Sequence, residues 1–212
     1  MKLYTFYAST DTNTYLLATD AGKALVIDPA EPASVLLGFL EEHKLTLTKI
    51  LLTHGHYDHI SGVSELQKAT GAQLLVHEDD AAMIADGELC LATLFHVEDY
   101  EPLIADTLLQ DGDTITQDEI TLTVLHTPGH TEGSICFLTG DMMFAGDTLF
   151  AGSVGRTDLA GGSPEAQRES LLRLKKIERD YRVYPGHGGV STLAHERAAN
   201  PYLRYVGNEF DF

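Results

Sequence analysis

Short apolar runs bounded by polar or turn-forming residues dominate the first third of the chain, and such runs are typical of β-strands. Segments with the period of a helix follow them. The pattern predicts strands at Lys2–Tyr7, Thr14–Thr19 and Ala24–Ile27, a helix over Ser34–His43, a fully buried strand at Ile50–Thr53, a helix over Gly62–Ala69 and a strand at Gln73–Val76. Strands and helices therefore alternate in this half.

Strand patterns return in the second half after a mixed stretch. Residues 78–105 have no clear period and are expected to hold helical pieces joined by a loop. After the turn signal Asp111-Gly112-Asp113, the pattern predicts strands at Glu119–Leu125, Ser134–Leu138 and Met142–Ala145, a helix from Pro164 to about Ile177 with Ser163 as its N-cap, a strand at Arg182–Tyr184 and a helix over Thr192–Ala199. The second half thus repeats the plan of the first.

Two sheets with helices outside them predict an α/β fold, a four-layer αββα sandwich. Periodicity alone equally permits a three-layer α/β arrangement. No repeat, low-complexity tract or Pro/Ser-rich linker interrupts the chain. We therefore expect one domain over residues 1–212.

The charge balance narrows the classes of partner. The chain has 32 acidic and 14 basic residues and a formal net charge of -18, which repels nucleic acid and anionic lipid. No apolar run approaches the roughly 18 residues that span a bilayer, and the N-terminal segment lacks a signal-peptide pattern. We expect a cytoplasmic protein, a monomer or homodimer, with no nucleic-acid or membrane partner. Cys90 and Cys136 are expected to be buried thiols without a role.

The densest group of reactive side chains lies in Thr53-His54-Gly55-His56-Tyr57-Asp58-His59, directly after the strand predicted at Ile50–Thr53. A lone histidine is usually a surface or hydrogen-bonded core residue. Four ligand-type side chains together at a strand end would instead bury polar rings without partners, unless they bind metal. Small Gly55 lets the chain turn tightly, so that His54 and His56 can converge on one ion and Asp58 and His59 on a neighbouring point.

Three further candidate ligands each follow a glycine at a strand end: His130 in Pro128-Gly129-His130, Asp147 in Gly146-Asp147, and His187 in Gly186-His187. A glycine permits close approach of the backbone, so these loops could meet at one rim. With the first group they make seven ligands, enough for two divalent ions per chain with one shared carboxylate. Imidazole nitrogen favours zinc, our expected metal, with iron and manganese as alternatives.

The motifs THGHYDH, HTPGHT, FAGDTLF and YPGHG occur in the order found in the metallo-β-lactamase superfamily, which the chain resembles over nearly its whole length. The resemblance implies a first metal site at His54, His56 and His130, a second at Asp58, His59 and His187, and a bridging carboxylate at Asp147. It also implies that Asp28 supports the metal loop by a hydrogen bond. On the residues alone, Asp28 is as well explained as part of a turn-forming Asp-Pro.

Two metal ions that share a water lower its pKa and polarise the carbonyl that the resulting hydroxide attacks, so hydrolysis is the expected reaction. We expect Asp58 and Asp147 to act in catalysis as well as to bind metal. Nothing in the motifs supplies a nucleophilic Ser or Cys with a base.

The segment 150–158 (FAGSVGRTD) and the tail 196–204 (ERAANPYLR) resemble glyoxalase II and its short relatives. This implies hydrolysis of an S-(2-hydroxyacyl) thioester of glutathione. Arg156 is then expected to orient an anionic substrate group, unless it only pairs with Asp158 on the surface, and Tyr57 to line the pocket or merely to pack. Two departures leave another small thiol open as carrier: Gly189 replaces an aromatic residue of the family, and only 25 residues follow His187 where glyoxalase II has a helical domain.

Other activities share this fold. A persulfide dioxygenase, with one iron at the positions matching His54, His130 and Asp147, shares the segment Gly155-Arg156-Thr157-Asp158 and is the main alternative. A diiron electron-transfer module would replace His56 by Glu and add a flavin domain. A nuclease would need a basic groove, and a β-lactamase is usually secreted.

Overall fold

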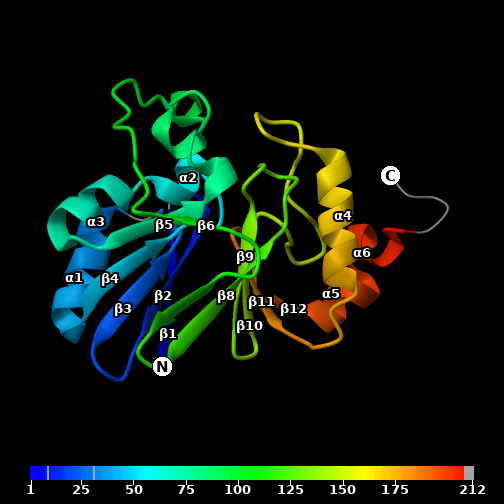
Figure 1. Cartoon of the computed structure of the whole chain (residues 1–212), viewed down its shortest axis with the longest axis horizontal. Helices are drawn as coiled ribbons and strands as arrows, with labels where there is room; N and C mark the ends of the chain where they lie inside the picture. Colours follow the sequence, from blue (N-terminus) through cyan, green and yellow to red (C-terminus); the bar gives the residue numbers. More distant parts are fainter. Residues whose placement is uncertain (9, 31, 208–212) are drawn as a thin grey trace.

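The computed structural model describes residues 1–8, 10–30 and 32–207; residues 9, 31 and 208–212, which the predicted domain also included, lie outside the described part. Two sheets form its centre (Figure 1). The first sheet holds, in spatial order, β1 (Lys2–Tyr7), β2 (Asn13–Ala18), β3 (Lys23–Ile27), β4 (Thr46–Leu51), β5 (Gln73–His77) and β6 (Thr107–Leu109). The strands β1 to β3 pair antiparallel, and β3 to β6 pair parallel.

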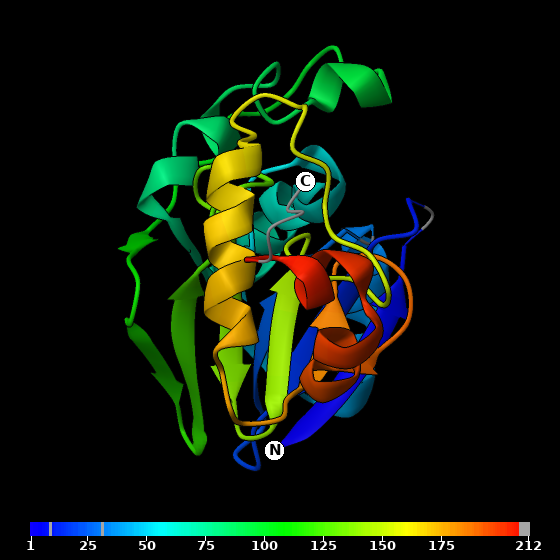
Figure 2. The ribbon, with the colours of Figure 1, turned by 90° about the vertical axis from the view of Figure 1, so that its right-hand side faces the viewer.

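The second sheet holds, in spatial order, β12 (Ser191–Thr192), β11 (Arg182–Pro185), β10 (Met142–Gly146), β9 (Ile135–Thr139), β8 (Ile120–His126) and β7 (Thr114–Gln117). Only the β10–β11 pair is parallel. Helices α1 (Ala33–His43) and α3 (Val63–Thr70) cover the outer face of the first sheet. Helices α4 (Pro164–Lys175), α5 (Leu193–Ala199) and α6 (Pro201–Tyr205) cover the second (Figure 2). The predicted αββα sandwich is confirmed, and the three-layer alternative is wrong.

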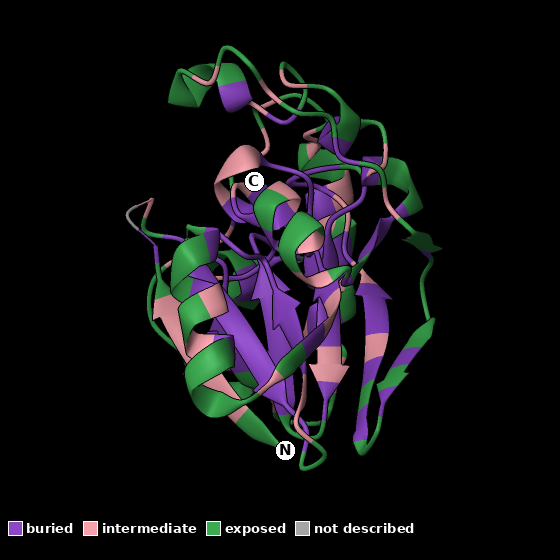
Figure 3. Ribbon diagram, turned by 90° about the vertical axis from the view of Figure 1, so that its left-hand side faces the viewer, coloured by how far each residue is buried: buried purple, intermediate pink, exposed green. Residues whose placement is uncertain are grey.

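Three apolar clusters fill the spaces between the four layers. Residues such as Leu16 and Ile50 face α1 and α3, whereas their strand neighbours Leu17 and Leu51 face the second sheet and meet Phe137. A third cluster packs the outer face of the second sheet against α4, α5 and α6. Figure 3 shows the consequence: the strands are largely buried, and the helices in front of them expose their outer faces. Because central strands such as β2 are buried on both faces, most of their residues are apolar.

The structure differs from the predicted elements at three edge strands, at two short helices and in the extent of one central strand. The strand predicted at Ile50–Thr53 is β4, which begins at Thr46 and ends at Leu51. The short strands β6, β7 and β12 and the helices α2 (Tyr57–Ile60) and α6 were not predicted, because their few apolar positions carry no period. The stretch 78–105 contains three 3₁₀ turns, η1 (Glu78–Asp80), η2 (Met83–Ala85) and η3 (Ala92–Phe95). Ser163 caps α4 as predicted, since its hydroxyl accepts a bond from Ala166 N.

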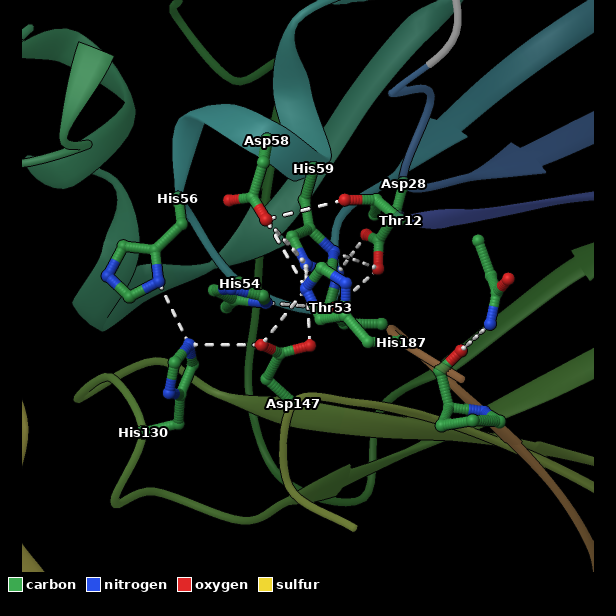
Figure 4. A network of polar contacts seen from close by, with 12 residues as sticks. Thr12, Asp28, Thr53, His54, His56, Asp58, His59, His130, Asp147 and His187 are labelled. Atoms are coloured by element: carbon green, nitrogen blue, oxygen red, sulfur yellow. Dashed lines mark hydrogen bonds and ion pairs between the residues drawn. The ribbon is translucent and has the colours of Figure 1, made fainter. Parts of the chain in front are cut away.

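The loops that follow β4, β8, β10 and β11 carry the candidate ligands, and the loop after β3 carries Asp28. The side chains of these residues lie close together (Figure 4). Both cysteines are buried and free, as expected. Among the described residues, no helix combines the length and the apolar character needed to cross a bilayer.

Candidate metal centre

The seven side chains that the sequence singled out lie together between the two sheets, and their polar atoms point toward one another (Figure 4). His56 Nδ1 lies 2.9 Å from His130 Nε2, although the two residues are 74 positions apart. His59 Nε2 lies 3.3 Å from His187 Nε2 across 128 positions. Loops from both sheets therefore build one polar centre.

Within this centre the donors form two groups that Asp147 joins. His54, His56 and His130 make one group, and Asp58, His59 and His187 make the other, with the donor atoms of each group within 4.8 Å of one another. Asp147 Oδ1 lies 3.3 Å from His59 Nε2, and Asp147 Oδ2 lies 3.5 Å from both His130 Nε2 and His187 Nε2. The carboxylate of Asp147 thus lies near members of both groups, where two ions could share it.

Three buried atoms of the centre have no hydrogen-bond partner among the described residues: His54 Nε2, His56 Nε2 and Asp147 Oδ1. Nearly all buried polar groups in proteins are hydrogen-bonded, so three such atoms among seven neighbouring candidate ligands indicate that something else stabilises these side chains. The rings of His54, His56 and His130 are inclined to one another by 80–90°, which lets three in-plane lone pairs converge. The centre therefore fits the binding of metal ions.

The pKa values of three buried histidines are displaced in opposite directions. Burial lowers the pKa of His56 to about 3 and holds the pKa of His54 well below its usual range. Burial also disfavours the charged form of His59, but the carboxylates of Asp147 and Asp58 outweigh it and raise the pKa of His59 well above its usual range. His54 and His56 thus present neutral imidazoles, the form that binds metal.

Asp28, buried at the end of β3, holds the metal loop by three hydrogen bonds. Its Oδ1 accepts from Thr53 N (2.8 Å), and its Oδ2 accepts from Thr53 Oγ1 (2.6 Å) and His59 Nδ1 (3.0 Å). Asp28 itself has a left-handed backbone (φ 50°), which aspartate tolerates better than most residues. The structure thus places Asp28 where the resemblance expected it, orienting the ring of His59.

Two other rings are oriented by backbone carbonyls. His130 Nδ1 donates to Arg156 O (2.7 Å), and His187 Nδ1 donates to Asp11 O (3.0 Å). Thr12 Oγ1 adds a bond to Asp58 Oδ2 (3.3 Å). Sequence reasoning missed these partners, because any residue type can supply a carbonyl and no side-chain pattern reports it.

Asp80 is a buried carboxylate that sequence reasoning also missed. It accepts bonds from Gly55 N (2.9 Å), Thr131 Oγ1 (2.8 Å) and Gly133 N (2.7 Å), so it ties the loop of His54 and His56 to the loop of His130. Burial raises the pKa of Asp80. Asp80 belongs to the acidic run Glu78–Asp80, and nothing in the sequence distinguishes it there from a surface residue.

The glycines before the candidate ligands are required by close packing. A Cβ at Gly186 would collide with Asp147 Oδ1 and with the His59 ring, and a Cβ at Gly146 would collide with Thr53 Oγ1. Gly146 also has a left-handed backbone (φ 47°). The expectation that these glycines permit close approach to the site is confirmed.

A cavity of about 500 Å³ opens onto the centre. Its described lining consists of His56, Asp58, Leu91, Leu94, Phe95, His130, Asp147, Phe150, Val154, Gly155, Arg156, Leu159 and His187. Arg156 lies in this wall, but its guanidinium also pairs with Asp158 through two bonds of 2.6 and 2.8 Å. Tyr57 is not part of the lining; its ring packs near Phe95 and Tyr100, with centroids 5.5 and 6.2 Å away.

Another group of metal-type donors, His77, Asp79 and His126, lies outside this cavity. The two rings stack with centroids 3.9 Å apart and planes inclined by 17°. His77 Nδ1 accepts a bond from Asp79 N, and His126 Nε2 donates to Glu132 O. The sequence assigned no function to either histidine.

Residues 9–187 match the family model of the metallo-beta-lactamase superfamily. An uncharacterised protein of Mycobacterium leprae is 37% identical over 206 residues, which cover 90% of this chain and 93% of that protein. The hydroxyacylglutathione hydrolase GloC of Haemophilus influenzae is 31% identical over 195 residues, which cover 90% of this chain and 92% of GloC.

Among solved structures, the chain is similar to TTHA1623 in a di-iron-bound form. The TM-score is 0.83 and the sequence identity 34%, over 95% of this chain and 100% of that one. The similarity therefore extends over nearly the whole chain.

Proposed function

Because the chain belongs to the metallo-β-lactamase superfamily, we propose that it is a binuclear metal-dependent thioester hydrolase of the glyoxalase II type. The proposed substrate is an S-(2-hydroxyacyl) conjugate of glutathione or of a related small thiol, and the proposed location is the cytoplasm. The observation that carries the proposal is the pair of donor groups joined by Asp147 at the floor of one cavity. The name of the relative GloC supports the choice of substrate class.

His54, His56 and His130 would hold one ion and Asp58, His59 and His187 the other, with Asp147 shared between them. Zinc is the proposed metal, and iron or manganese would fit the same nitrogen and carboxylate donors. When bound, two such ions supply an activated water and polarise a carbonyl.

The chain's own side chains favour attack by water over covalent catalysis. The described lining of the cavity contains no Ser or Cys, and both cysteines are buried elsewhere. Asp28 and the carbonyls of Asp11 and Arg156 hold the rings of His59, His187 and His130 in one orientation each. A thiolate leaves readily, so the reaction needs little help from a general acid at the leaving group.

Arg156 is proposed to receive an anionic part of the substrate. It is the one Arg or Lys in the described lining, and its partner Asp158 is as exposed as Arg156 itself, so a substrate carboxylate can compete for the guanidinium. In a chain with a net charge of -18, this cation is the local feature that would attract an anion.

The test is to purify the protein under low oxygen without added metal or chelator, measure its metal content by elemental mass spectrometry, and assay hydrolysis of S-lactoylglutathione and of lactoyl thioesters of other small thiols. We expect close to two ions per chain and turnover that chelation abolishes. One iron per chain, with oxygen consumed when a persulfide is added, would instead establish the dioxygenase. Two ions without turnover of any thioester would refute the proposed reaction while leaving the metal centre intact.

A further inference from the structure

One wall of the cavity is apolar. It consists of Leu91, Leu94 and Phe95 from the stretch around η3, together with Phe150, Val154 and Leu159. Leu94 is 65% exposed and Phe95 is 41% exposed. Two adjacent large apolar side chains that stay in contact with water at the mouth of a cavity indicate a surface for an apolar ligand.

The backbone around η3 is held in a strained conformation. Leu91 (φ 67°) and His96 (φ 60°), the residues on either side of η3, both have left-handed backbones. This conformation is disfavoured for residues with a Cβ, and for a bulky leucine it is a marked outlier. Such strain persists where surrounding contacts impose it, often at ligand-binding segments. Here Tyr57 N donates to Cys90 O (2.7 Å), which fastens the stretch before η3 to the metal loop.

The charges in the cavity favour an acyl group over a thiol carrier at this wall. Small thiol carriers such as glutathione are polar and charged, and a desolvated charge against leucine and phenylalanine is costly. Arg156, the one Arg or Lys in the described lining, could receive the carrier's charge. The remaining apolar wall then fits the hydrocarbon part of the other half of a thioester.

We propose that the wall formed by Leu94 and Phe95 binds the acyl chain, and that the enzyme prefers thioesters whose acyl groups are apolar and longer than lactoyl. This inference rests on the proposed thioester hydrolase function. Leu94 and Phe95 are then residues that determine specificity and take no part in the bond-breaking step.

The test uses the metal-loaded enzyme and thioesters of N-acetylcysteamine with acyl groups from acetyl to octanoyl. We expect kcat/KM to rise roughly twofold to fourfold for each methylene that the wall covers. The double variant Leu94→Ser with Phe95→Ser should lose most of this increment. Ile104→Ser is the matched control, since Ile104 is 81% exposed and lies outside the described lining.

Matching ketones, in which a methylene replaces the thioester sulfur, measure binding without turnover by calorimetry. Their affinity should rise with acyl length in the wild type and in Ile104→Ser, and stay flat in the double variant. A flat series in the wild type overturns the proposal, as does a slope that the double variant retains. A rise that follows a more apolar carrier, with the acetyl group held constant, also overturns it.

If no thioester is hydrolysed, the proposed reaction fails, and the ketone affinities by themselves decide whether the wall binds an acyl chain.

Discussion

Two groups of histidines in this protein differ in how their rings are inclined to one another, which decides whether their nitrogens can bind the same metal ion. In the central group the rings of His56 and His130 stand at 90° with centroids 4.6 Å apart, whereas His77 and His126 stack at 17° and 3.9 Å. Lone pairs lie in the plane of an imidazole ring, so inclined rings can share an ion and stacked rings cannot without moving. Proximity of two histidines is therefore not sufficient for metal binding.

The groups also differ in what already satisfies their nitrogens. At the centre, the Nε2 atoms of His54 and His56 are buried without a partner. In the outer pair, His77 Nδ1 and His126 Nε2 are engaged with Asp79 N and Glu132 O. The comparison teaches that buried ring nitrogens without a partner distinguish the candidate metal centre from the stacked pair of His77 and His126.

The largest expected effect comes from removing a histidine of the metal centre, compared with removing a histidine of the stacked pair. His54→Ala should lose metal at the centre and with it the activity, a greater loss than the roughly 10- to 100-fold that removing an outer partner of a ligand costs. His126→Ala is the matched control and should keep the wild-type metal content. Elemental mass spectrometry of both purified variants checks this, and loss of metal from His126→Ala would break the comparison.

A collision inside the centre should have the next largest effect. Gly186→Ala places a methyl group against Asp147 Oδ1 and the His59 ring, so we expect a loss of metal and a destabilisation of about 1–3 kcal/mol. Gly189→Ala, three residues along the same loop, meets no heavy atom within 4 Å and should behave as the wild type. Urea unfolding and metal content of the pair measure the difference, and equal behaviour would contradict the packing argument.

The outer support of the second donor group gives a smaller, graded effect. Asp28→Asn keeps the size and the left-handed backbone but removes the charge beside His59 Nδ1, so metal affinity should fall about 10- to 100-fold. Asp118→Asn is a fitting control, because Asp118 has a similar backbone (φ 52°) and lies on the surface beside Lys23. Competition with a chromogenic chelator compares the two affinities. Unchanged affinity in Asp28→Asn would show that Asp28 does not support the site.

The smallest expected effect is on how the free energy of unfolding depends on pH, through His77 of the stacked pair. Burial, followed by the neighbouring His126, lowers the pKa of His77 from its ordinary 6.5. The unfolded chain therefore takes up this proton at a higher pH than the folded one, so His77 contributes stability above about pH 6.5 that is lost as the pH falls toward its folded pKa.

Replacing His77 by Gln should reduce the loss of unfolding free energy between pH 7.5 and 5.5, by no more than about 1.4 kcal/mol per pH unit, the limit for one proton. Urea unfolding at both values measures the slope. The same slope in His77→Gln as in the wild type would mean that His77 titrates equally in both states.

The strands that are buried on both faces were predictable, because complete burial requires mostly apolar residues. Runs such as Leu16–Leu17 and Ile50–Leu51 contain only residues that a core accepts. The edge strands β6 and β7 were not predictable, because part of each faces solvent and their pairing depends on β5 and β8. The extent of β4 was misjudged for the same reason, since its first residues alternate with polar ones.

The site shows a similar division. The seven candidate ligands were predictable, because four of them lie within six residues after a strand and the other three each follow a glycine at a strand end. Asp80 was missed, because its three bonds come from loops that begin 25 and 51 positions away. Whether Tyr57 lines the pocket or packs depends on the orientation of its ring, which the sequence does not determine. In the structure the ring lies near Tyr100 and not in the cavity lining.

The sequence by itself determined the alternation of strands and helices, the residues of the two donor groups and the superfamily, since these depend on residue type and local spacing. Only the tertiary structure decided how the donors converge, which nitrogens stay unsatisfied, and that Leu94 and Phe95 stand beside the metal centre. The physical reason is that these features depend on distances between segments far apart in the chain, which packing of the two sheets sets and no local pattern records.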